Sequence, residues 1–205
     1  MKKYFAYIIT TLLLLASCKK DHSIILTTQE FPSSVGSWWE YEMSYNNSNI
    51  HDTAIITILD TIMLSGYTWQ RWVQNQFGPD FSNWTDTIYV YTTNNSFEFY
   101  LTYYGPPSSQ PPPWTFNFPI IDNEPWGPPI GLVSYTTKVQ NITAGGVSYN
   151  NLAYLSKTTN SGAPQDVNSY ESFWIQKNVG IVEHDFDYPF QNKYTHYSMI
   201  SFHIN

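Results

Sequence analysis

The chain has 205 residues, of which 18% are aromatic and only 12% are charged, with 9 Lys and Arg against 16 Asp and Glu. This acidic balance argues against a nucleic-acid partner, which requires a basic surface. The single Cys excludes a disulfide framework, a Cys-based zinc site and a redox pair. The length allows one domain or at most two small ones.

The first 17 residues have the features of an export signal. Lys2 and Lys3 precede an apolar run from Tyr4 to Leu15, and small residues follow it. The run is shorter than the roughly 20 residues that a membrane-spanning helix needs. We therefore predict a signal peptide over residues 1–17 that is removed after export.

The sequence Leu15-Ala16-Ser17-Cys18 directly after the apolar run resembles the lipobox of bacterial lipoproteins. The resemblance implies that Cys18 carries a diacylglyceryl group and a further acyl chain such as palmitate, and that residues 18–30 form a lipidated tether. Several acyl chains hold a protein on a membrane, whereas one chain binds only marginally. We expect attachment to the bacterial outer membrane, at either the periplasmic face or the cell surface. A conventional secretory signal with an incidental Cys is the alternative.

The pattern of the remaining sequence predicts consecutive β-strands. Ten segments alternate polar and bulky residues and are rich in Tyr, Trp, Ile, Val and Thr, and Gly or Asn turn signals separate them. These segments are 38–45, 53–59, 67–73, 87–91, 97–103, 132–139, 147–155, 170–175, 181–186 and 194–204. We predict an all-β domain over residues 31–205, a single antiparallel meander sheet of about ten strands curved into a half-barrel, a barrel or a sandwich.

Three motifs in this region carry a family resemblance. The sequence has Phe31-Pro32 followed by Gly36-x-Trp38, a second Phe-Pro pair at 118–119, and Phe-Trp-Ile-Gln-Lys-Asn-Val-Gly-Ile-Val at 173–182. Together they resemble a group of bacterial outer-membrane lipoproteins to which no activity is assigned. The resemblance implies an antiparallel β fold that ends in a hairpin with Val-Gly at its turn, and it implies no catalytic residue.

The Pro-rich segment from Tyr103 to Pro129 is the most distinctive stretch. Pro stiffens the chain and removes backbone donors, so we expect a rigid loop that cannot join the centre of the sheet. Rings that are ordered before binding suit stacking on sugars or apolar ligands. We therefore predict a ligand surface formed by Tyr103, Tyr104, Trp114 and Trp126. The alternative is that Trp114 and Trp126 only cap one end of the sheet.

Acidic residues are densest at 183–187. In a strand, Glu183, Asp185 and Asp187 share one face and His184 lies on the other. Three carboxylates suit Ca²⁺, but a flat strand does not wrap an ion, so we interpret the segment as a solvated strand face and predict no metal or cofactor.

No arrangement of nucleophile, base and orienting group is evident in the sequence, and no Gly-x-Ser-x-Gly motif occurs. We therefore expect a non-enzymatic, membrane-anchored binding module for a glycan or an apolar ligand. The alternative is a structural or assembly lipoprotein that docks an envelope protein partner through its aromatic-rich sheet, because aromatic residues are also favoured at interfaces. A hydrolase with paired carboxylates is a remote third option.

Overall fold

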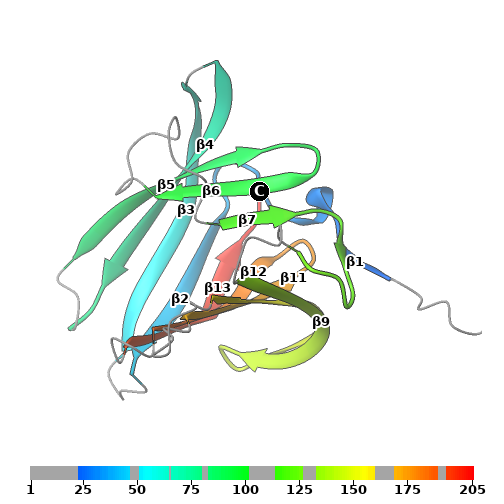
Figure 1. The fold of residues 1–205 in the computed structure, drawn as a ribbon. Helices are drawn as coiled ribbons and strands as arrows, with labels where there is room; N and C mark the ends of the chain where they lie inside the picture. Colours follow the sequence, from blue (N-terminus) through cyan, green and yellow to red (C-terminus); the bar gives the residue numbers. More distant parts are fainter. Residues whose placement is uncertain are drawn as a thin grey trace, which may run out of the picture.

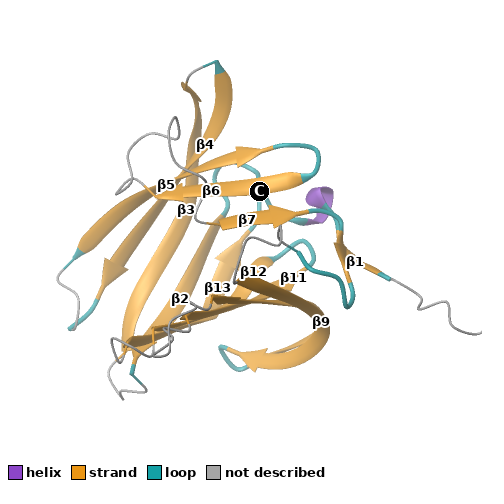
Figure 2. Ribbon diagram, viewed as in Figure 1, coloured by secondary structure: helices purple, strands orange, loops and turns teal. Residues whose placement is uncertain are grey.

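The structure is a computed structural model, which describes residues 23–46, 51–64, 66–79, 83–101, 114–126, 133–159, 169–188 and 193–205. Within these ranges nearly all regular structure is β-strand, and one short 3₁₀ helix, η1, covers Thr28–Glu30 (Figure 2). The predicted all-β class is confirmed. In this part of the chain, no helix is long and apolar enough to cross a membrane.

Eleven strands form one antiparallel sheet. In chain order they are β2 (Trp38–Tyr45), β3 (His51–Leu64), β4 (Tyr67–Phe77), β5 (Trp84–Thr92), β6 (Ser96–Leu101), β7 (Trp114–Asn117), β9 (Val133–Ala144), β10 (Val147–Thr159), β11 (Ser169–Gln176), β12 (Gly180–Tyr188) and β13 (Lys193–His203). Their order across the sheet is β7-β6-β5-β4-β3-β2-β13-β12-β11-β10-β9. Of these eleven strands, the one that the sequence did not predict is β7, a four-residue edge strand next to the prolines.

The sheet consists of two meanders that meet where the first and last of its strands pair. Tyr41 of β2 lies opposite Met199 of β13, and each half continues outward from this pair through neighbouring hairpins. The sheet curves strongly, so that the β6–β7 side and the β9–β12 side face one another (Figure 1). Among the described strands, the edges β7 and β9 do not pair with each other. The predicted curved meander is therefore an open half-barrel and not a closed barrel.

A second, two-stranded sheet lies at one end of this half-barrel. Strand β1 (Ile24–Leu26) pairs with β8 (Ile120–Ile121), and both contribute buried side chains to the core. A capping box holds η1 next to β1, since the Thr27 N–H donates to the Glu30 carboxylate at 2.8 Å. Glu30 also binds Lys177 Nζ at 2.9 Å. The described β structure thus begins before Phe31, within the segment predicted to be a tether.

Trp39, which directly follows the Gly36-x-Trp38 motif, contacts the Val-Gly motif at 179–180 in the core. The indole N–H of Trp39 donates to the carbonyl oxygen of Val179 at 2.5 Å. Gly180 has a φ of +99°, and a Cβ there would lie 3.1 Å from Trp39 Nε1. The Val-Gly turn therefore needs a glycine both for its backbone conformation and for the close approach of the Trp39 ring.

The C-terminal meander curls back on itself. The register between β9 and β10 shifts between Tyr149 and Leu152, and a bulge of this kind bends a strand. The curl brings the β9–β10 turn against β13, where a Cβ on Gly145 would overlap the carbonyl oxygen of Met199. This contact closes the C-terminal half into a tight roll.

Candidate functional site

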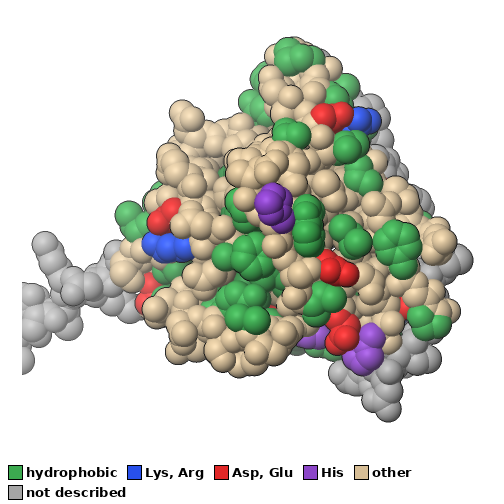
Figure 3. All heavy atoms as spheres, turned by 180° about the vertical axis from the view of Figure 1, so that it is seen from behind, with side chains coloured by type: hydrophobic (Ala, Val, Ile, Leu, Met, Phe, Trp, Pro, Cys, Tyr) green, Lys and Arg blue, Asp and Glu red, His purple; other side chains and the backbone are tan. Residues whose placement is uncertain are grey.

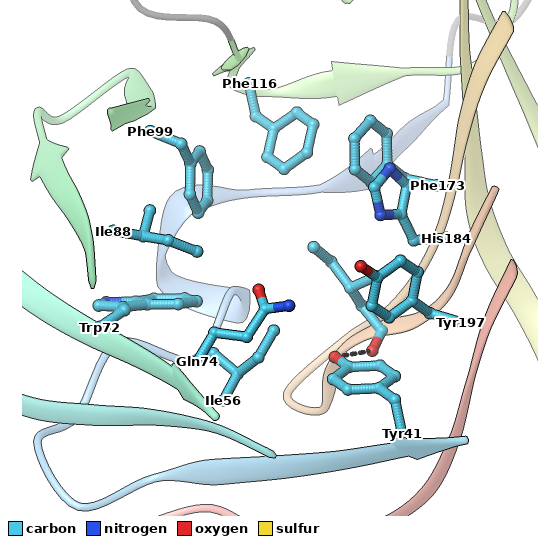
Figure 4. Close-up of a pocket in the computed structure, with 11 residues that line it drawn as sticks. Tyr41, Ile56, Trp72, Gln74, Ile88, Phe99, Phe116, Phe173, His184 and Tyr197 are labelled. Carbon is cyan, nitrogen blue, oxygen red and sulfur yellow. Dashed lines mark hydrogen bonds between the residues drawn. The ribbon is translucent and has the colours of Figure 1, made fainter. Parts of the chain in front are cut away.

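The concave side of the half-barrel contains a cavity of about 110 Å³ (Figure 4). Both meanders contribute to its wall, and most of the contributing side chains are aromatic or aliphatic. The lining residues are Tyr41, Ile56, Trp72, Gln74, Ile88, Phe99 and Phe116 from the N-terminal meander, and Phe173, Ile181, His184 and Tyr197 from the C-terminal meander.

The period of two residues in a strand places these side chains inside. Trp72 and Gln74 are two apart on β4 and share the concave face. The rings of Phe116 and Phe173 approach to 5.0 Å in an edge-to-face arrangement and bridge the two halves. Ring pairs of this kind contribute beyond the apolar area that they bury, so they help to hold the wall in shape.

One end of the cavity is polar. His184 stacks on Phe173, with ring centroids 4.3 Å apart and an interplanar angle of 6°, and its Nε2 lies 3.1 Å from Glu171 Oε1. The Tyr197 ring stacks on the other side of His184 at 5.5 Å. The Glu171 side chain is only 5% exposed, so this pair is fixed in the wall.

Two tyrosines of the wall stay protonated. Burial raises the pKa of Tyr41, and its hydroxyl donates to the Ile181 carbonyl oxygen at 2.8 Å. Burial also raises the pKa of Tyr197, partly offset by hydrogen bonds with Gln74 and Gln76 that favour the phenolate. Both hydroxyls therefore serve as neutral hydrogen-bonding groups and not as bases.

The cavity is suited to bind a small apolar group. An engineered cavity of about 150 Å³ with aliphatic and aromatic walls stays dry and binds benzene. The present cavity is of the same order and has similar walls. Ile56, Gln74, Ile181, His184 and Tyr197 are only partly buried, so the cavity is not sealed from solvent.

Of the residues predicted as a ligand surface, Trp126 is the one whose side chain the structure describes, and it does not line this cavity. Trp126 is 3% exposed, packs against Phe116 and Tyr135, and donates from Nε1 to the Ser156 carbonyl oxygen at 3.0 Å. Its indole is thus packed between the two halves and does not offer an exposed stacking face. Trp114 begins β7.

The other predicted residues, Tyr103 and Tyr104, lie outside the described residues, as does Cys18. The surface role of the two tyrosines and the lipidation of Cys18 stay predictions.

Sequence reasoning did not single out the polar residues of the cavity. Gln74 follows the buried Trp72 by two positions and is therefore a polar side chain at an inward-facing strand position. This pattern was the signal in the sequence that could have identified Gln74 as a cavity residue. His184 was placed on the face opposite Glu183 and Asp185, and the structure bears this out. Its contact with Glu171 on the neighbouring strand could not be read from a single sequence.

The outer face carries Asp185 with its partners Tyr194 and His196. Asp185 Oδ1 accepts a hydrogen bond from the Tyr194 hydroxyl at 3.0 Å and lies 2.6 Å from His196 Nδ1. Figure 3 shows acidic and histidine side chains dispersed among polar and hydrophobic ones on this side. Within the described part of the chain, no group of three or more His, Cys, Asp or Glu residues is placed to hold a metal ion.

The His196–Asp185 contact predicts a pH dependence of stability. The hydrogen bond to Asp185 raises the pKa of His196, and the carboxylates of Glu183 and Glu42 act in the same direction. A group whose folded-state pKa is raised stabilises the fold below its unfolded value, about 6.5, and loses this contribution as the pH rises through the folded value. We expect the free energy of unfolding of the wild type, relative to that of His196→Gln, to fall as the pH rises above about 6.5.

Denaturant titrations at several pH values check this expectation. His203→Gln is the control, because His203 Nε2 contacts Asn205 and not a carboxylate. A His196→Gln variant that keeps the wild-type pH profile would show that this ion pair does not contribute.

Comparison with known proteins adds the fold and no activity. No family model matches the chain, and no curated protein matches it in sequence. A solved structure from Bacteroides fragilis, of a protein assigned as exported and described as having a YmcC-like fold, is similar with a TM-score of 0.54 and 8% identity, over 84% of this chain and 98% of that chain.

A second solved structure, of a protein from Parabacteroides distasonis assigned as a lipoprotein, is similar with a TM-score of 0.52 and 12% identity, over 90% of this chain and 100% of that chain. At these identities the likeness shows a shared fold alone.

Proposed function

We propose that the protein is an exported, lipid-anchored binding module of the outer membrane that holds a small apolar ligand in its concave cavity. The observation that carries this proposal is the apolar wall of Trp72, Ile88, Phe99, Phe116 and Phe173 around about 110 Å³ of space. Binding sites for small molecules are mostly apolar with a few placed polar groups. The same observation favours an apolar ligand over a glycan, whose hydroxyl groups need many polar partners.

The anchor rests on the lipobox-like sequence ending at Cys18, and the assignment of two proteins of similar fold as exported or as a lipoprotein supports it. Five residues separate Cys18 from Ile24, the first residue of β1, so these two residues are at most about 20 Å apart in an extended chain. The domain would therefore lie close to the lipid surface, with the β1–β8 end toward it. A Cys18→Ser variant that still fractionates with membranes would contradict the anchor.

Blocking the cavity tests the binding function. We expect the full chain in lipid nanodiscs to bind toluene saturably and the Ile88→Trp variant not to bind it, because Ile88 lines the cavity and the larger side chain would fill it. Calorimetric titration measures binding, and empty nanodiscs give the background from toluene that dissolves in lipid.

The matched control is Ile200→Trp, since Ile200 is 45% exposed and lies outside the cavity. It should bind toluene as the wild type does. Should Ile88→Trp fail to fold, Ile56→Phe blocks the partly exposed side of the wall instead. A folded, blocked variant that binds toluene as tightly as the wild type would refute the cavity as the site.

A further inference from the structure

We propose that the cavity selects a neutral ligand that has one ring-sized apolar body and one hydroxyl or N–H group, and that Gln74, Tyr197 and His184 bind this polar group. This inference rests on the proposed binding function and specifies its ligand class. It depends on the size of the cavity, on the position of its polar groups and on their charge.

The size limits the apolar body. A volume of about 110 Å³ is close to what one six-membered ring needs, and Trp72, Phe99, Phe116 and Phe173 present ring faces and edges to it. An aromatic ligand can pack against these rings in offset or edge-to-face contact. A fused multi-ring body or a long acyl chain exceeds the space.

The polar groups converge at one side. The carboxamide of Gln74 and the hydroxyl of Tyr197 both point into the cavity, and the imidazole of His184 lies next to Tyr197 (Figure 4). A carboxamide has two N–H donors and one acceptor oxygen, so Gln74 can bond Tyr197 and a ligand hydroxyl together. A hydroxyl both donates and accepts, which suits this mixed set of partners.

The charges of the wall favour a neutral group. None of the described residues that line the cavity is Lys or Arg, and the imidazole that could meet an anion is already 3.1 Å from the Glu171 carboxylate. A ligand carboxylate would therefore lose its hydration without gaining a cation of its own. A ligand cation would compete with His184 for Glu171, whose side chain is 5% exposed and does not line the cavity.

Four probes of similar size separate these features: phenol, toluene, benzoate and benzylammonium. Transfer from water to an apolar site is more favourable for toluene than for phenol. We nevertheless expect the full chain in nanodiscs to bind phenol about tenfold more tightly than toluene, because a hydrogen bond contributes about this factor. Benzoate and benzylammonium should bind more weakly than phenol. Titration of the blocked Ile88→Trp variant supplies the background.

Tyr197→Phe and Gln74→Met remove polar atoms with little change of shape. Each should bring phenol to within about threefold of toluene and leave the toluene affinity unchanged, whereas the surface control Tyr67→Phe, at a side chain 56% exposed, should keep the preference. Equal or tighter binding of toluene by the wild type, or tightest binding of either ion, would overturn the inference and leave the proposed function standing. Failure of all four probes to bind would overturn both.

Discussion

Replacing Phe116 by Ala is expected to lower the free energy of unfolding by about 3–5 kcal/mol, the range for truncation of a buried Phe. Phe116 is 1% exposed and its ring lies 5.4 Å from Phe99, 5.4 Å from Trp126 and 5.0 Å from Phe173. The side chain thus joins edge strand β7 to the opposite half of the sheet. Its loss removes the Phe116–Phe173 contact between the two halves and enlarges the cavity.

Phe77→Ala is the matched control for this experiment. Phe77 ends β4 and is 43% exposed, so its truncation should cost about 1 kcal/mol or less. Urea denaturation followed by Trp fluorescence measures both. Similar losses in the two variants would mean that the Phe116 contacts do not hold the two halves together.

Gly145→Ala is expected to destabilise the fold by about 2–5 kcal/mol. Gly145 has a φ of +54°, and a Cβ would overlap the Met199 carbonyl oxygen and lie 3.0 Å from Ile200 Cα. Left-handed backbone costs a non-glycine residue about 1–2 kcal/mol, and overpacking against a fixed neighbour adds about 1–3 kcal/mol. Because the obstacle is backbone, no side chain can move aside to relieve it.

A variant of the neighbouring Gly146 distinguishes the cost of the left-handed backbone from the cost of overpacking. Gly146 also has a positive φ, +78°, but a Cβ there meets no atom within 4 Å. Gly146→Ala should therefore show only the backbone cost of about 1–2 kcal/mol. Equal losses for the two variants in denaturant titrations would show that the β9–β10 turn does not press on β13.

The class of fold was readable from the sequence because alternation is local. In segments such as 38–45 and 181–186, the alternation by itself predicts a strand. It also placed His184 correctly on the face opposite Glu183 and Asp185. The length of β3 and β4 was underestimated, since both extend beyond the alternating core of the predicted segments.

The packing of the two halves of the sheet against each other could not be predicted from the sequence, because it depends on residues without a periodic pattern. Phe118 and Trp126 lie in the Pro-rich part of the chain, yet both are buried in the core. The two Phe-Pro segments even meet, with Phe31 and Phe118 rings 6.3 Å apart. Neither segment has a sequence feature that identifies the other as its contact partner.

The cavity was hidden for the same reason. Gln74 and His184 are more than a hundred positions apart and reach one space only because β2 and β13 join the two meanders. The two-residue period of side-chain direction shows which residues of one strand share a face. Which distant strands lie opposite each other depends instead on the curvature of the whole sheet.

A crystal structure of the protein grown with bromobenzene decides whether the cavity binds an apolar ring, since the bromine is located by its anomalous signal. The apolar-cavity account predicts one bound ring between Ile88, Phe99, Phe116 and Phe173, with the wall otherwise unchanged. A collapsed or water-filled cavity, with bromobenzene bound only elsewhere on the molecule, would contradict it.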